Sequence, residues 1–148
     1  MFSVIELENI SKTYENTHAL KQVSLNILEG EVFSLLGPNG SGKTTLLRIM
    51  AGIERPTSGE MRFNGVKVEE GNINHVRSKT TMVFQKTALF NTSVYKNIAY
   101  GLRLRGLTKK ETDEKIRETL KTVMLEGYEK RLAKKLSGGE PVSYTHLT

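Results

Sequence analysis

Glycines, a lysine and two threonines with the spacing of a phosphate-binding loop occur early in the chain. They lie in the segment Gly37-Pro38-Asn39-Gly40-Ser41-Gly42-Lys43-Thr44-Thr45. The three glycines let the backbone turn tightly, so that successive N–H groups face one concavity that suits phosphate oxygens. Lys43 adds a positive charge for the β- and γ-phosphates, and Thr44 offers a hydroxyl to Mg²⁺. This is a complete Walker A loop, and it predicts binding of ATP or another nucleoside triphosphate with Mg²⁺.

The residues around this loop have the expected pattern. The run Glu31-Val32-Phe33-Ser34-Leu35-Leu36 is short, apolar and bounded by glycines, which predicts a buried parallel strand. Apolar residues from Leu46 to Met50 then predict a helix that ends near Gly52. Such a helix directs its positive dipole end at a bound anion. The alternative is a glycine-rich turn that matches the motif by accident.

Composition limits the kinds of protein that the chain can be. It has 148 residues, no cysteine and a net charge of +6. No apolar run approaches the roughly 20 residues that span a bilayer, so we expect membrane association to come through a partner. Eleven Lys or Arg and six Asp or Glu lie in residues 103–135, with the two signs interleaved. This mixing predicts a solvated helix face; a nucleic-acid patch is the alternative, but no aromatic residues are arranged among the charges for base stacking.

The chain changes from strand patterns to helix patterns along its length. We expect strands at residues 3–9, 23–27, 60–63, 66–68 and 80–84, with a hairpin turn at Asn64-Gly65. We expect helices at residues 93–104 and from Thr108 onward. Glu111 makes a capping box with Thr108, and the second helix has an apolar stripe of Ile116, Leu120, Val123 and Met124.

A second motif narrows the class of nucleotide-binding protein. The segment Leu136-Ser137-Gly138-Gly139-Glu140 matches the signature motif of the ATP-binding cassette (ABC) family. From about Val4 to Glu140 the chain resembles an ABC ATPase subunit. The resemblance implies an α/β fold, with a P-loop NTPase (RecA-like) core, an N-terminal antiparallel β subdomain and an α-helical subdomain. We expect the core and β subdomain in residues 1–85 and the helical subdomain in residues 86–140.

The resemblance also implies roles for residues outside the Walker A loop. An aromatic residue before the loop stacks on adenine in this family, and Tyr14 is at that place; otherwise it would be a packing residue. Gln85 resembles the glutamine of the Q-loop, which approaches Mg²⁺ and the attacking water and senses the membrane partner; otherwise it is a solvated loop residue.

The signature implies a dimer. We expect Ser137 and the N–H groups of Gly138 and Gly139 to form a second anion cradle at a helix start. In the family, each signature closes over ATP that is held by the Walker A loop of the other subunit, in a head-to-tail arrangement.

The resemblance ends after Glu140. The Walker B strand with its Mg²⁺-binding Asp and catalytic Glu, and the switch His, do not follow, and His18, His75 and His146 do not occupy the switch position. We interpret residues 141–148 as a non-native tail, because Val-Ser-Tyr-Thr-His-Leu-Thr matches a translated transposase adapter; a divergent natural C-terminus is the alternative. With the C-terminal part of the core missing, we expect residues 32–36 to lack partners, and the chain to be poorly soluble and without ATPase activity.

The implied function is that of the ATP-hydrolysing subunit of an ABC transporter at the cytoplasmic face of the membrane. The implied partners are integral membrane permease subunits, a second ATP-binding subunit and a solute-binding protein. We expect the importer type, because residues 129–135 lack the Gly-rich acidic segment of exporters; residues 84–102 resemble tungstate or molybdate importers. The alternatives are a soluble ABC ATPase of translation or DNA repair, and a fragment that binds nucleotide without catalysis.

Overall fold

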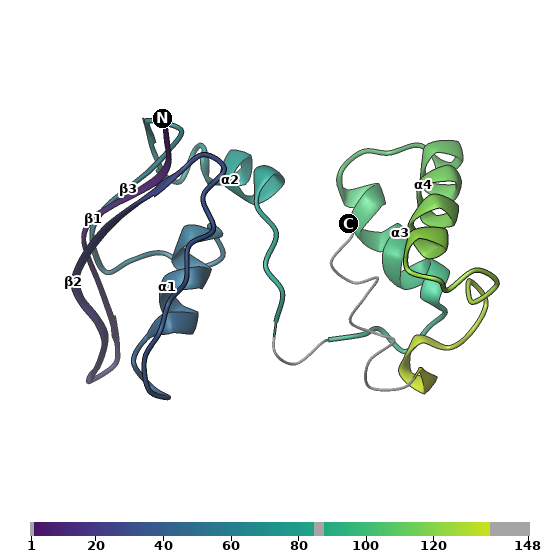
Figure 1. Cartoon of the computed structure of the whole chain (residues 1–148), viewed down its shortest axis with the longest axis horizontal. Coiled ribbons are helices and arrows are strands. Elements are labelled where there is room, and N and C mark those ends of the chain that lie inside the picture. Colours follow the sequence, from purple (N-terminus) through teal and green to yellow (C-terminus); the bar gives the residue numbers. More distant parts are fainter. Residues whose placement is uncertain (1, 85–87, 137–148) are drawn as a thin grey trace. The chain divides into compact units, whose positions relative to one another are not determined.

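The computed structural model describes residues 2–84 and 88–136. The chain divides into two compact units, Met1–Met82 and Val83–Thr148 (Figure 1). Each unit has its own cluster of buried apolar side chains. Within the described ranges, no helix has the length and apolar character needed to cross a membrane.

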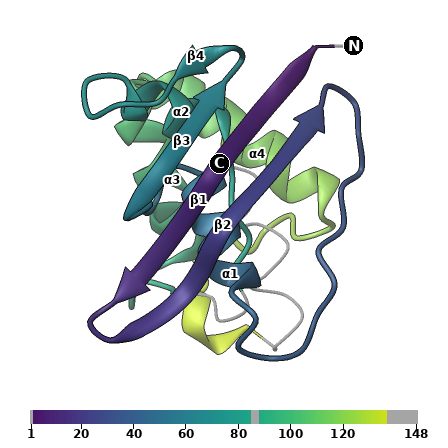
Figure 2. The same ribbon diagram turned by 90° about the vertical axis from the view of Figure 1, so that its left-hand side faces the viewer.

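The first unit is built on an antiparallel sheet. Its strands are β1 (Ser3–Tyr14), β2 (Thr17–Leu28), β3 (Ser58–Phe63) and β4 (Val66–Lys67), in the order β2-β1-β3-β4 (Figure 2). The hairpin turn predicted at Asn64-Gly65 is confirmed, and both residues have positive φ angles, as the turn requires. The N-terminal antiparallel β subdomain is therefore confirmed, with β1 and β2 longer than their apolar patterns indicated.

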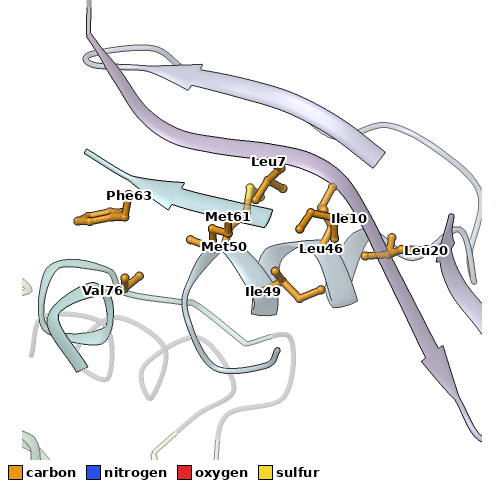
Figure 3. Close-up of a cluster of buried hydrophobic side chains, with 9 residues drawn as sticks. All are labelled: Leu7, Ile10, Leu20, Leu46, Ile49, Met50, Met61, Phe63 and Val76. Carbon is orange, nitrogen blue, oxygen red and sulfur yellow. The ribbon is translucent and has the colours of Figure 1, made fainter. Parts of the chain in front are cut away.

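One helix covers the core side of this sheet. Helix α1 (Lys43–Met50) directs Leu46, Ile49 and Met50 toward side chains from β1 and β3 (Figure 3). Helix α2 (Ile73–Lys79) adds Val76 to the same cluster. The complete cluster is Leu7, Ile10, Leu20, Leu46, Ile49, Met50, Met61, Phe63 and Val76. Burial of these side chains fixes the start of α1 against the sheet.

Two predicted strands are absent from the described structure. Residues 31–36 form a loop, in which the side chains of Val32 and Leu36 are each 94% exposed, and only Leu35 packs against the core cluster. Residues 80–84 are also without strand structure. A parallel strand exists only through hydrogen bonds with neighbouring strands, and none of the described strands pairs with either segment. The predictions of a buried strand at 31–36 and of a strand at 80–84 are wrong for this structure.

The second unit contains a pair of helices with well-defined starts. In α3 (Val94–Leu104) the Ser93 hydroxyl accepts the N–H of Lys96, and α4 (Lys109–Thr122) begins with the predicted capping box of Thr108 and Glu111. A short 3₁₀ turn, η1, follows at Ala133–Lys135. The buried cluster consists of Val94, Ile98, Ala99, Leu102, Ile116, Leu120, Leu125 and Ala133.

One residue of the predicted apolar stripe does not belong to it. Met124 is 91% exposed, because α4 ends at Thr122 and Met124 has a positive φ in the turn that follows. Leu125 is buried in its place.

Candidate phosphate-binding site

The Walker A loop leads directly into α1. Gly42 is the N-cap of the helix, with φ +85°, and no side chain caps the first helical turn within the described part of the chain. The first N–H groups of a helix have no partner inside the helix. Together with the helix dipole, uncapped N–H groups make this helix start suitable for an anion.

Gly42 also holds the loop against the sheet. A Cβ atom at this position would lie 2.3 Å from the carbonyl oxygen of Ala19 and 2.7 Å from Cδ2 of Leu20. No side chain fits in that space. Gly40 differs, because its φ is +82° but a Cβ there would meet no atom within 4 Å. The loop is therefore packed on β2 at Gly42 and open at Gly40.

Lys43 has its ammonium group inside the loop. The Nζ atom donates to the carbonyl oxygens of Gly37 at 2.8 Å and Pro38 at 2.7 Å, and to the hydroxyl of Ser41 at 3.2 Å. The cation is thus held among the main-chain atoms that the glycine spacing brings together. Asn39 and Thr44 are exposed and Thr45 is half-buried.

This donor set fits a polyphosphate. It offers uncapped N–H groups, an ammonium group and the accessible hydroxyl of Thr44. Mg²⁺ prefers oxygen ligands and usually keeps waters and substrate phosphates in its shell, so one hydroxyl is a sufficient protein contribution here. The residues around the loop include no cluster of His, Asp or Glu of the kind that forms an all-protein metal site, as far as the described ranges extend.

Tyr14 belongs to the same unit and lies at the end of β1. It pairs with Thr17 across the β1–β2 hairpin and is 40% exposed. Two residues earlier, Lys12 pairs with Leu20, the residue whose side chain lies against Gly42. A strand rises about 3.3 Å per residue, so Tyr14 is roughly 7 Å further along β1 than this contact. Tyr14 therefore lies on the same hairpin that contacts the loop, two residues along β1 from the residue that pairs with Leu20.

A largely buried ion pair accompanies Tyr14 and was not predicted from the sequence. Lys12 Nζ lies 3.2 Å from Glu54 Oε1 and 5.1 Å from the centroid of the Tyr14 ring. Burial would raise the pKa of Glu54, but the Tyr14 hydroxyl and the Lys12 ammonium outweigh it, so that the pKa lies below its ordinary value. The sequence contains one indication of this contact. Residues two apart on a strand share a face, so Lys12 is expected beside Tyr14. No such signal identifies Glu54.

Four of the predicted site residues lie in segments that the structure does not describe. These are Gln85, Ser137, Gly138 and Gly139. The structure therefore brings together the Walker A residues and Tyr14, all from the first unit.

The second unit has an aromatic groove on α3 and the segment before it. The groove has a volume of about 390 Å³ and is lined by Phe90, Thr92, Tyr95, Lys96, Ala99, Tyr100 and Arg103. The rings of Phe90 and Tyr100 meet edge to face at 5.0 Å, yet each residue is more than half exposed. Tyr95 donates a hydrogen bond to Asp113 on α4, which, with burial, raises the pKa of Tyr95.

Comparison with known proteins gives consistent matches. Residues 20–144 match the model of the ABC transporter family. The structure of cbiO1 from Clostridium perfringens, part of the ABC transporter complex cbiONQ, aligns with a TM-score of 0.82 and 30% identity. The alignment covers 99% of the present chain but only 61% of cbiO1.

Two structures of MJ0796, a bacterial ABC transporter cassette, align equally well. Its dimer has a TM-score of 0.82 and 31% identity, and its post-hydrolysis state with ADP and Pi has a TM-score of 0.82 and 30% identity. Each alignment covers 97% of the present chain and 68% of MJ0796.

Proposed function

The chain belongs to the ABC transporter family, and from this premise we propose that it acts as the ATP-binding part of a membrane transporter. We assign ATP hydrolysis, and the movement of solute that it drives, to the whole protein and not to these 148 residues alone. The observation that carries the proposal is the uncapped start of α1, with Lys43 held inside the loop that precedes it. This arrangement suits the phosphates of a nucleoside triphosphate such as ATP.

The positions of the Walker A residues and Tyr14 support the roles that we propose for them. The backbone of residues 37–45 surrounds the phosphates, Lys43 leaves the carbonyls of Gly37 and Pro38 to contact the β- and γ-phosphates, and Thr44 contributes its hydroxyl to Mg²⁺. When bound, Mg²⁺ neutralises phosphate charge. Tyr14 stacks on the adenine. Gln85, for water and Mg²⁺ positioning, and Ser137, Gly138 and Gly139, for ATP on the opposite subunit, stay predictions from the sequence.

The proposed domain organisation also stays a prediction from the sequence. It has a nucleotide-binding core with its β subdomain in residues 1–85, a helical subdomain in residues 86–140 and a non-native tail in residues 141–148.

We further propose two kinds of partner. The dimer of MJ0796 supports pairing with a second ATP-binding subunit, and the place of cbiO1 in cbiONQ supports assembly with membrane permease subunits at the cytoplasmic face. The exposed aromatic groove is a suitable docking surface for a permease segment. Lys96 and Arg103 line the groove, and no acidic residue does so within the part of the chain that the structure describes. We therefore expect that segment to combine apolar and acidic side chains.

The proposal extends to the direction of transport. We propose an importer, supplied by a solute-binding protein, on the sequence features of residues 84–102 and 129–135. A tungstate- or molybdate-like oxyanion is the proposed solute.

The experiment that tests the proposal measures binding of Mg²⁺-ATP to the chain by equilibrium dialysis. We expect Lys43→Ala to weaken binding roughly ten- to hundredfold, since it removes a charge-assisted contact to phosphate. Lys21→Ala is the matched control, because Lys21 has the same charge, lies in the same unit on β2 and is exposed. Unchanged affinity in Lys43→Ala, or no binding by the wild-type chain, would refute the proposal.

A further inference from the structure

Three contacts hold the side chain of Lys12. Its Nζ atom lies 3.2 Å from Glu54 Oε1, donates to the carbonyl oxygen of Arg55 at 2.8 Å, and lies 5.1 Å from the centroid of the Tyr14 ring. The side chains of Lys12 and Glu54 are only 16% and 17% exposed. A long side chain with three partners and so little exposure has one well-defined position.

Glu54 is itself tied to the helix that follows the phosphate loop. The N–H groups of Ile53 and Glu54 donate to the carbonyl oxygen of Arg48 in α1, at 2.9 and 3.2 Å. The helix that begins at the Walker A loop therefore ends in the segment that carries Glu54.

The same segment is bonded to the end of β1. Thr57 N–H donates to Ser11 O at 2.8 Å, and Thr13 N–H donates to the Thr57 hydroxyl at 3.1 Å. Glu54 and Lys12 thus connect α1 to the strand end that carries Tyr14.

We propose that Lys12 and Glu54 are positioning residues for the nucleotide base. Lys12 covers one face of the Tyr14 ring and fixes its angle, which leaves the other face free to stack on the adenine of ATP. A ring that is already fixed loses less freedom when a base binds, so the affinity rises. This inference rests on the proposed function, because it assumes that ATP occupies the loop.

The competing explanation is that the Lys12–Glu54 pair only stabilises the sheet. In that case its loss would weaken binding of every ligand of the loop to the same extent. Inorganic tripolyphosphate with Mg²⁺ distinguishes the two explanations, because it offers the same phosphates without a base.

The test compares dissociation constants of ATP and tripolyphosphate for the wild-type chain, Lys12→Met and Lys12→Arg. We expect Lys12→Met to weaken ATP binding about two- to fivefold, the range of a cation–π contact, with tripolyphosphate binding unchanged. Lys12→Arg should restore ATP binding, because a guanidinium also packs on an aromatic face. Glu54→Gln should act like Lys12→Met, since it releases the ammonium group.

A fluorescence version of this test observes the aromatic ring at position 14 directly. The chain has no tryptophan, so Tyr14→Trp places the single tryptophan of the variant at the stacking position, where its emission can be excited selectively. We expect ATP to quench its emission and tripolyphosphate to leave it unchanged, with a smaller quench by ATP when Lys12→Met is added.

The outcomes separate this inference from the function on which it rests. If the wild-type chain binds neither ligand, both the function and this inference fail. If it binds ATP but Lys12→Met leaves the ratio of the ATP and tripolyphosphate affinities unchanged, the positioning role alone is overturned.

Discussion

Two glycines of the Walker A loop have similar positive φ angles but different surroundings. Gly42 and Gly40 have φ angles of +85° and +82°. A Cβ atom at Gly42 would lie 2.3 Å from Ala19 O, whereas a Cβ atom at Gly40 would have no atom within 4 Å. An alanine at either position costs about 1–2 kcal/mol for its left-handed backbone. The difference between the two substitutions therefore isolates the packing of the loop on β2.

We predict that Gly42→Ala lowers the free energy of unfolding by roughly 1–3 kcal/mol more than Gly40→Ala does, because the loop must move away from β2. Urea denaturation followed by circular dichroism measures both values. Gly40→Ala is the matched control for the backbone term. Equal losses in the two variants would show that the loop is not packed against Ala19 and Leu20.

The loop residues could be predicted from their spacing, whereas the residues that contact Tyr14 could not. Gly37 to Thr45 are consecutive, so their chemistry is visible in one segment of sequence. Lys12 and Glu54 are far apart in the sequence and meet only because β3 brings the segment after α1 back to β1. Local spacing contains no information about a contact that depends on strand pairing across the sheet.

Among the elements, α4 has the best-defined start. The Thr108 hydroxyl accepts the N–H of Glu111, and the Glu111 carboxylate accepts the N–H of Thr108 at 2.8 Å and its hydroxyl at 2.6 Å. Both hydrogen bonds to the carboxylate lower the pKa of Glu111 below its usual value of 4.5, and the bond from the hydroxyl has the larger effect.

We predict that Thr108→Ala destabilises α4 by about 1 kcal/mol near neutral pH. Because the pKa of Glu111 is lowered in the folded chain, its contribution is present above pH 4.5 and is lost as the pH falls through the folded value. The difference in α4 stability between the wild-type chain and Glu111→Gln should therefore become smaller as the pH falls. Hydrogen exchange of the α4 amides from pH 7 to pH 3 measures it, with exposed Lys110→Ala as the control; a difference that does not depend on pH would contradict the prediction.

The helices with local signals were predicted correctly, whereas two of the predicted strands, at residues 31–36 and 80–84, have no described partner strand. The capping residues and apolar spacing of α3 and α4 lie within each helix. Residues 31–36 and 80–84 have the composition of buried strands, but a strand needs hydrogen-bonded neighbours, and the described sheet provides none. Helix α2 was missed because it has only seven residues, and only Ile73 and Val76 are buried.

At the scale of the whole molecule, exposed apolar residues gather in the segment between β2 and the Walker A loop. Val32 and Leu36 are each 94% exposed, and Phe33 is 39% exposed. Isolated exposed apolar residues are ordinary, but several of them within one short segment favour association with other apolar surfaces. The exposure of Val32 and Leu36 agrees with the expectation that residues 32–36 lack partners, but Leu35 packs against the core cluster.

We predict that the double variant Val32→Lys and Leu36→Lys stays monomeric at a higher concentration than the wild-type chain, because two charges replace the most exposed apolar side chains of the segment. Light scattering against protein concentration measures this. Leu104→Lys is the matched control: Leu104 is 73% exposed, but Arg103 and Arg105 already flank it with positive charge, so a further lysine should change association little. If Leu104→Lys restored the monomer as well as the double variant does, the general rise in net charge would be the cause, and the segment before the Walker A loop would have no special role in self-association.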